Sequence, residues 1–195
     1  GLIGDDTQGR MMKGELLKYP NIDISNLTVE GLSSVTHVMN AQDTKQRTFF
    51  YQGGASDIYD ESYIDWETLD ADIFHLEYLL LMAKVDGPDE EYGTLGARIL
   101  HDARERGMKT SIDVVSEQSD RAAGIVSAAL KYTDYCSINE VEAEAVTGVK
   151  LTGADGLTEE KVKEALLKLN EKGVTTWAVI HCPQCGYGYD CQKQE

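Results

Sequence analysis

From about Asp72 onward, short apolar runs alternate with longer amphipathic runs. Short apolar runs are typical of buried strands, and apolar residues spaced three to four positions apart are typical of helices. The pattern predicts strands at about 72–82, 108–115, 134–139 and 174–180. It predicts helices at about 87–107, 119–132, 140–148 and 157–173. In the first of these helices, Pro88 is expected in the first turn and Gly107 at the end.

Strands that alternate with helices of this length form βαβ units, and therefore a parallel sheet covered by helices. Ligands of such sheets bind beyond the carboxyl ends of the strands. The predicted strands carry polar residues at these ends, namely Glu77, Asp113, Asn139 with Glu142, and His181. We therefore expect a ligand site along this edge. His75, in the middle of its strand, is expected to be satisfied within the core.

The first seventy residues have a different pattern. Asp6 is a candidate N-cap for a helix at 7–19. Two β-rich runs flank the polar segment 41–46 and predict an antiparallel hairpin at about 33–54. The second arm of this hairpin carries three consecutive aromatic residues, 49–51, which cannot all face one core. One side of the hairpin is therefore expected to meet a ligand or a partner.

Composition limits the possible functions. The 195 residues suffice for one domain with a sizeable core, and the net charge is −16, from 34 acidic and 18 basic residues. So acidic a surface repels nucleic acid, and any bound phosphate needs a local dipole or a metal ion. No apolar run approaches the roughly 20 residues of a membrane span, and no signal peptide is recognisable. We expect a cytoplasmic protein with reduced cysteines.

Asn139 ends an apolar run and is followed by Glu140, Glu142 and Glu144. Asparagine is a favourable N-cap, and carboxylates stabilise the first turn of a helix. A helix N-terminus also binds anions through its free N–H groups. A carboxylate there would repel a nucleotide unless a hard divalent cation lay between them. These residues alone leave both a phosphate–metal site and a simple helix start open.

Five segments, in this order and spacing, resemble the ribokinase-like carbohydrate kinases of the PfkB family. The first has the form Gly-x-Ile-Gly-x-Asp-x-x-Gly, with the matching residues Gly1, Gly4, Asp6 and Gly9. The others are NIDIS (21–25), TKQRTFFYQGGA (44–55), SINEVEA (137–143) and LLKLNEKGVTTWAVI (166–180). The resemblance covers essentially the whole chain up to Ile180.

The resemblance implies an α/β, three-layer αβα fold with a mainly parallel sheet and a small β lid hairpin. Residues 1–195 would form a single incomplete domain of this kind. Family members use ATP and Mg²⁺ to phosphorylate a sugar or nucleoside hydroxyl. The resemblance assigns Asn139 and Glu142 to the magnesium–phosphate assembly, with Glu142 reaching Mg²⁺ through water.

The substrate side is less well defined. Arg47, Glu77 and Asp113 are candidates, although Arg47 could simply be exposed on the hairpin and Asp113 could cap the next loop. Glu117 stands where the family has an arginine that neutralises acidic sugars, which favours a neutral sugar or a nucleoside. In relatives the lid hairpin pairs with a second subunit, so a homodimer through the lid is expected.

The chain also departs from the family pattern. The Gly-Ala-Gly-Asp segment with the catalytic base is absent, and TGADG at 152–156 is an echo in the wrong place. The early sugar-binding segment is absent too, and HCPQCG (181–186) keeps only the last glycine of a phosphate-contacting motif. We assign no catalytic residue and expect a piece of a longer protein that is inactive alone. The alternative is a non-catalytic module, derived from a kinase fold, that binds a ligand or metal.

Three of the four cysteines lie near the C-terminus, at Cys182, Cys185 and Cys191. Cys-x-x-Cys supplies two thiolates to zinc, and His181 or Cys191 could complete such a set. No second Cys-x-x-Cys is present, as a structural zinc site normally requires. A redox pair and plain strand-end cysteines are the other interpretations.

Overall fold

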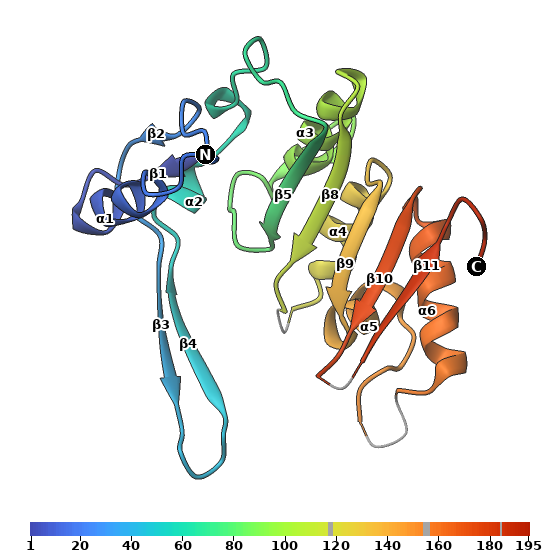
Figure 1. Cartoon of the computed structure of the whole chain (residues 1–195). Coiled ribbons are helices and arrows are strands. Elements are labelled where there is room, and N and C mark those ends of the chain that lie inside the picture. Colours follow the sequence, from blue (N-terminus) through green and yellow to red (C-terminus); the bar gives the residue numbers. More distant parts are fainter. Residues whose placement is uncertain (117–118, 154–156, 184) are drawn as a thin grey trace. The chain divides into compact units, whose positions relative to one another are not determined.

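The main sheet has the strand order β11-β10-β9-β8-β5 (Figure 1). The computed structural model describes residues 1–116, 119–153, 157–183 and 185–195. The strands β5 (Ile73–Leu79), β8 (Lys109–Val114), β9 (Tyr135–Asn139) and β10 (Trp177–His181) pair in parallel. The last strand, β11 (Gly186–Asp190), runs antiparallel to β10. The expected α/β class with a mainly parallel sheet is confirmed.

Four helices pack on one face of this sheet. They are α3 (Leu95–Glu105), α4 (Ala122–Leu130), α5 (Glu140–Thr147) and α6 (Glu159–Glu171), and neighbours in this series contact each other (Figure 1). Strand residues that face the helices, such as Ile112, Ile138 and Ile180, are completely buried. Among the described residues, no helix is long and apolar enough to cross a membrane.

The opposite face of the sheet, which we call the open face, carries polar side chains together with exposed apolar ones such as Ile73 and Trp177. Alternate side chains of a strand point to opposite faces. Ser111, Asp113, Ser137 and His181 alternate with the buried residues of their strands and are exposed or half-buried. The polar strand residues that the sequence singled out therefore share one surface.

The segment before α3 differs from the prediction. The helix begins at Leu95, and residues 88–94 form a short hairpin of β6 (Pro88–Asp89) and β7 (Gly93–Thr94). The carboxylate of Asp89 accepts from the N–H groups of residues 91 and 92 (3.0 and 2.8 Å), which stabilises a turn. Gly93 has φ +90°, and Thr94 caps the helix. Pro88 is therefore outside the helix, and the prediction for 87–94 is wrong.

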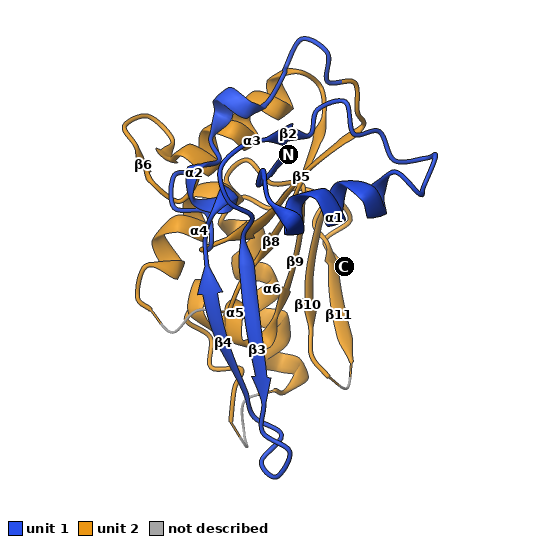
Figure 2. Ribbon diagram, turned by 90° about the vertical axis from the view of Figure 1, so that its left-hand side faces the viewer, with its two compact units in different colours: residues 1–69, 81–84 blue, residues 70–80, 85–195 orange. Residues whose placement is uncertain are grey.

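The chain divides into two compact units, residues 1–69 with 81–84 and residues 70–80 with 85–195 (Figure 2). Unit 1 contains the parallel pair β1 (Leu2–Ile3) and β2 (Thr28–Val29), and helices α1 (Thr7–Leu16) and α2 (Ala55–Ile58). A 3₁₀ turn, η1, covers Glu61–Tyr63. The expected antiparallel hairpin is present as β3 (Val35–Asn40) and β4 (Arg47–Gln52).

The glycine-rich opening segment has a clear structural role in unit 1. Asp6 is the N-cap of α1 and accepts from the Gly9 N–H (2.8 Å). The same carboxylate accepts from the backbone N–H and hydroxyl of Ser33 (2.7 and 2.8 Å). A Cβ at Gly9 would lie 1.8 Å from the carbonyl oxygen of Gly4, so only glycine fits there. The spacing of this motif is therefore required for close backbone packing.

Asp134 joins three strands at the amino edge of the main sheet. Its side chain is 2% exposed and accepts from the Thr110 N–H (3.0 Å), the Thr175 hydroxyl (2.7 Å) and Lys109 Nζ (3.2 Å). Burial raises the pKa of Asp134. Hydrogen bonds from Thr110, Thr175 and Lys109, with a smaller effect of the Arg104 charge, lower this pKa by more than burial raises it. The net pKa lies below its ordinary value.

We predict that Asp134→Ala lowers the free energy of unfolding by about 2–3 kcal/mol, because buried donors lose their acceptor. Urea unfolding followed by circular dichroism measures this change. The difference should shrink as the pH falls below about 3.9, since a carboxylate with a lowered pKa stabilises the fold only while it is ionised. Asp72→Ala, at an exposed site, is the control and should change stability by less than about 0.5 kcal/mol. Equal effects of the two substitutions would contradict the prediction.

Candidate functional site

The first turn of α5 begins with a reciprocal capping box. The side-chain oxygen of Asn139 accepts from the N–H groups of Val141 and Glu142 (both 2.9 Å). In return, Glu142 Oε2 accepts from the Asn139 N–H (2.9 Å). Asn-x-x-Glu is thus a sequence signal that starts the helix. It fixes both side chains at the carboxyl end of β9.

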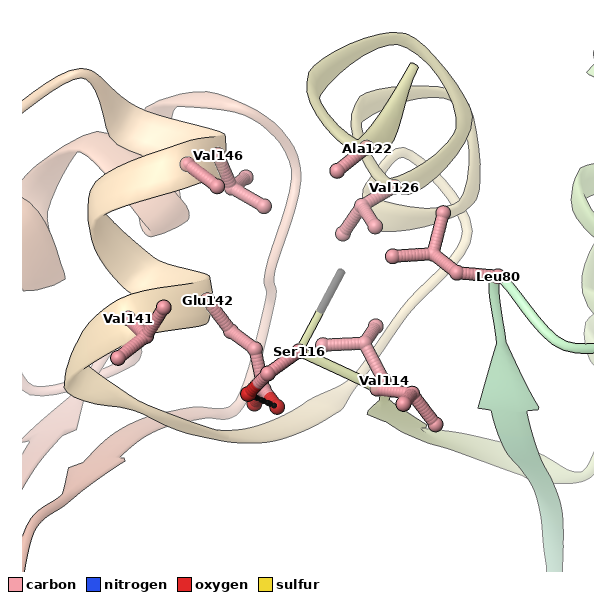
Figure 3. A pocket seen from close by; sticks show the side chains of 10 residues that line it. Leu80, Val114, Ser116, Ala122, Val126, Val141, Glu142 and Val146 are labelled. Carbon is pink, nitrogen blue, oxygen red and sulfur yellow. Dashed lines mark hydrogen bonds between the residues drawn. The ribbon is translucent and has the colours of Figure 1, made fainter. Parts of the chain in front are cut away.

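A third residue, Ser116, completes the cluster from the neighbouring strand. Its hydroxyl donates to Glu142 Oε1 (2.8 Å), and Figure 3 shows the two side chains pointing toward each other. Asn139 Nδ2 donates both to Ser116 Oγ (2.9 Å) and to Glu142 Oε1 (2.7 Å). Ser116 lies just beyond the end of β8 (Lys109–Val114). Ser116 was not among the residues predicted for the site, and its position just after a strand end is the only sequence signal that marks it.

Two glutamates in this segment, Glu142 and Glu144, have different surroundings. Glu142 is 7% exposed, and burial raises its pKa although hydrogen bonds from Asn139 and Ser116 act in the opposite direction. Asp113 raises this pKa further, whereas His181 lowers it. Glu144 instead accepts hydrogen bonds from Lys150, Leu151 and Thr152, and its pKa is lowered to about 2. Glu144 therefore stabilises a loop, and only Glu142 belongs to the site.

A small cavity lies beside the Glu142 side chain, between α4 and α5. Leu80, Val114, Val126 and Val146 form much of its apolar wall (Figure 3). Its volume is about 10 Å³, close to the minimum that holds one water molecule. The cavity therefore has room for one water molecule at most, and any larger ligand must bind outside it.

The end of β5 is the most irregular part of the sheet. The β5–β8 pairing shifts register between Leu76 and Leu79, and Tyr78 and Leu80 have φ of 59° and 84°. Asp86 accepts from the Leu80 N–H (2.9 Å), and Arg121 Nη2 donates to the Leu80 carbonyl (2.6 Å). Non-glycine residues in this region of φ are strained and are enriched at functional sites. The sequence pattern gave no sign of this turn.

The carboxyl edge also contains two further predicted residues. His181, at the end of β10, is directly paired with Asn139 in the sheet register. Asp113 lies on β8 two residues beyond Ser111, and its carboxylate accepts from the Val114 N–H (2.8 Å). The structure thus brings Asp113, Asn139, Glu142 and His181 to one edge, as the alternation of strands and helices predicted for these residues.

The profile of the pfkB family of carbohydrate kinases matches residues 1–187. The chain belongs to this family.

Solved structures support the same fold. The ribokinase of Giardia lamblia matches with a TM-score of 0.73 and 16% identity, over 100% of this chain and 56% of that chain. The ribokinase of Thermotoga maritima has a TM-score of 0.69 and 20% identity, over 100% and 57%. The ribokinase of Arabidopsis thaliana, solved with ribose and ATP, has a TM-score of 0.72 and 19% identity, over 100% and 58%. No curated protein matches.

This pfkB chain therefore spans little more than half the length of these ribokinases. At identities of 20% or less, the structural likeness shows the ribokinase-like fold alone.

The remaining candidates are placed separately. Arg47, in unit 1, ends the hairpin turn, and its guanidinium carbon lies 5.6 Å from the centre of the Phe49 ring. Glu77 is exposed on β5, with its Oε1 3.4 Å from His75 Nε2. The side chain of His75 is 42% exposed, so the expectation that it is satisfied in the core is wrong. His75 alternates with the buried Leu76 and therefore points to the open face.

Some sequence features fall outside what the structure describes. These are Glu117, Gln184 and the last three residues of the TGADG segment. Within the described residues, no group of three or more His, Cys, Asp or Glu side chains could hold a metal ion. A Mg²⁺ site does not need such a group, because Mg²⁺ commonly keeps several waters and can be bound through one carboxylate.

For this pfkB chain we predict that Glu142 and Glu144 titrate far apart. The pKa of Glu142 should lie above its ordinary value of 4.5, because burial disfavours its charge, and that of Glu144 should be about 2. NMR titration of the glutamate side-chain carboxyl carbons measures both. Two curves with the same midpoint near 4.5 would contradict the distinction between a site residue and a loop residue.

Proposed function

We propose that this chain carries the phosphate- and magnesium-positioning part of an ATP-dependent kinase that phosphorylates a sugar or nucleoside hydroxyl. One observation supports this most strongly. The Asn139–Glu142 capping box, joined to Ser116, lies at the carboxyl edge of the parallel sheet, where ligands of such sheets bind. Membership of the pfkB family of carbohydrate kinases supports this reaction class.

The residues at this edge fit a hydrated Mg²⁺ ion. Glu142 is a carboxylate already oriented by three donors, namely the Asn139 N–H, Asn139 Nδ2 and the Ser116 hydroxyl. Oxygen ligands and metal-bound water suit Mg²⁺, which rarely needs more than two carboxylates. Burial of Glu142 also disfavours its negative charge, and a nearby cation relieves that penalty. We propose that Glu142 holds Mg²⁺ through water.

Two other features act on the nucleotide. The first-turn N–H groups and the dipole of α5 attract phosphate oxygens. Asn139 keeps that turn in place and orients the carboxylate through its own N–H and amide. Bound Mg²⁺ supplies positive charge that offsets the charge of the phosphates and of this acidic chain. In this proposal ATP and Mg²⁺ are the cofactors, and the chain's own residues orient them.

The proposed substrate is a small polyol, sugar or nucleoside. Asp113 is the best supported substrate residue, because it lies on the open face beside the Glu142 cluster. Glu77 lies on the same face, on β5. Arg47 remains a candidate on the basis of resemblance alone. Glu117, where the family has an arginine, favours a neutral substrate over a sugar acid.

Other parts of the proposal concern partners. The β3–β4 hairpin exposes Val38, Met39, Phe49 and Phe50, with exposed fractions of 44–62%. Exposed strand edges and apolar side chains favour pairing, so we propose a homodimer through this hairpin. The net charge of −16 supports the proposal that nucleic acid is not a partner. We propose a cytoplasmic location.

A second candidate function is a non-catalytic binding module. It is favoured by the lack of a Gly-Ala-Gly-Asp segment in the 195 residues. Phosphoryl transfer depends on positioning and on charge stabilisation, so a chain without the anion-binding helix and base lacks the main catalytic device. In either case, residues 1–195 are proposed to form an incomplete ribokinase-like domain.

We predict that Mg·ATP binds and that Glu142→Gln weakens binding at least about tenfold, or about 1.4 kcal/mol, because a neutral amide cannot balance the cation. Isothermal titration calorimetry with excess Mg²⁺, and with EDTA instead, measures this. Glu140→Gln removes the same charge from the same turn without removing a described hydrogen bond, and should bind like the native chain. No heat with the native chain, or equal losses in both variants, would reject the proposed site.

We also predict that the 195-residue chain transfers no phosphoryl group by itself, because the segment with the catalytic base is absent. Incubation with ATP, Mg²⁺ and a panel of sugars and nucleosides, followed by phosphorus NMR, should show no sugar phosphate above a protein-free control. Product that forms with the native chain and disappears in Glu142→Gln would show that this chain is catalytic after all.

A further inference from the structure

The connection between β10 and β11 holds two cysteines close together. β10 ends at His181 and β11 begins at Gly186, and these two residues are paired in the sheet. The N–H of Cys182 donates to the carbonyl oxygen of Cys185 (2.8 Å). The backbone therefore brings the two cysteines together independently of any sulfur chemistry.

The two sulfur atoms already lie in contact. Cys182 Sγ is 3.1 Å from Cys185 Sγ, about 1 Å more than the bonded separation of about 2.05 Å. The Cys182 thiol is also 3.2 Å from the Cys185 carbonyl oxygen. Cys185 is exposed and Cys182 is half-buried, so solvent and small reagents reach the pair.

The other two cysteines have different environments. Cys136 is 1% exposed, and burial raises its pKa to about 12. Cys191 is half-buried just after β11, with its sulfur 3.8 Å from the Tyr189 carbonyl oxygen. Among the described residues, no third ligand joins Cys182 and Cys185 in a group suited to a metal ion. The geometry therefore favours a dithiol over a zinc site.

We propose that Cys182 and Cys185 form a thiol–disulfide exchange site for low-molecular-weight disulfides such as oxidised glutathione. A thiolate of the pair attacks one sulfur of the disulfide, which releases one small thiol and leaves a mixed disulfide on the protein. The second cysteine then attacks the protein sulfur of this mixed disulfide and releases the second small thiol. Two protein thiols are oxidised, and one small disulfide is reduced to two thiols.

The bond would be easily reversed. It would close a loop of only four residues, from 182 to 185, so it removes little entropy from the unfolded chain. Exposed disulfides are also the labile ones. The cross-link would lie next to His181, the residue that pairs with Asn139.

The test uses the native chain, fully reduced, freed of reductant and incubated with oxidised glutathione without nucleotide. Intact-mass measurement should show a loss of about 2 Da, the mass of two hydrogen atoms, reversed by dithiothreitol. Peptide mapping should locate the bond between Cys182 and Cys185. Cys182→Ser and Cys185→Ser should each stop at a glutathione adduct of about 305 Da on the remaining cysteine.

Cys191→Ser is the matched control and should still lose about 2 Da. Circular dichroism checks that each serine variant is folded. The proposal is overturned if the native chain keeps adducts on both cysteines, if the bond involves Cys191, or if neither cysteine reacts. Zinc bound at one ion per chain that blocks the reaction would also overturn it. None of these outcomes depends on ATP binding, so the kinase proposal is tested separately.

Discussion

Parallel pairing of β5, β8, β9 and β10 is the constraint on which the rest of the structure depends. This pairing places the carboxyl ends of these four strands at one edge, and it sets Asn139 directly beside His181. Because four helices cover one face, the buried residues of each strand, such as Ile112 and Ile138, point to that face, and Asp113, Ser137 and His181 point to the other. At the opposite edge, Asp134 joins the same strands through Thr110 and Thr175. The amino edge thus stabilises the sheet, and the carboxyl edge carries the polar residues of the candidate site.

The capping box serves both the fold and the candidate site. The hydrogen bonds that start α5 are the same ones that orient the Glu142 carboxylate. Glu144, two residues further along the helix, is bound by the loop around Thr152 and has its pKa lowered rather than raised. Glu142 and Glu144 are the same type of residue. Burial and hydrogen-bond donors decide which glutamate is available for a ligand.

Family membership and activity are separate conclusions for this chain. The pfkB profile covers residues 1–187, whereas the chain spans only 56–58% of the ribokinases described above. The 195 residues contain the Asn139–Glu142 segment that we propose to position phosphate and Mg²⁺, and they contain no Gly-Ala-Gly-Asp segment. The dithiol after β10 replaces a glycine-rich family motif. This departure gives the chain a chemistry that the family resemblance does not suggest.

Local signals in the sequence were sufficient for the four parallel strands, the helices that cover them, the β3–β4 hairpin and the start of α5. Apolar periodicity depends on neighbours within one or two turns, and Asn-x-x-Glu caps a helix through residues three positions apart. The hairpin at 88–94 was missed because Pro88 and the acids beside it are equally typical of a helix start, and the Asp89 turn competes with that helix.

The composition of the site, in contrast, was decided by the tertiary structure. Ser116 reaches Glu142 across 26 positions of sequence, and strand pairing alone brings them together. The exposure of His75 and the opposite pKa shifts of Glu142 and Glu144 likewise depend on which neighbours surround each side chain. The sequence by itself determined the four parallel strands, the helices between them and their order, because those follow from short-range geometry. Only the folded chain decided which polar groups meet, because burial and hydrogen bonding act between distant residues.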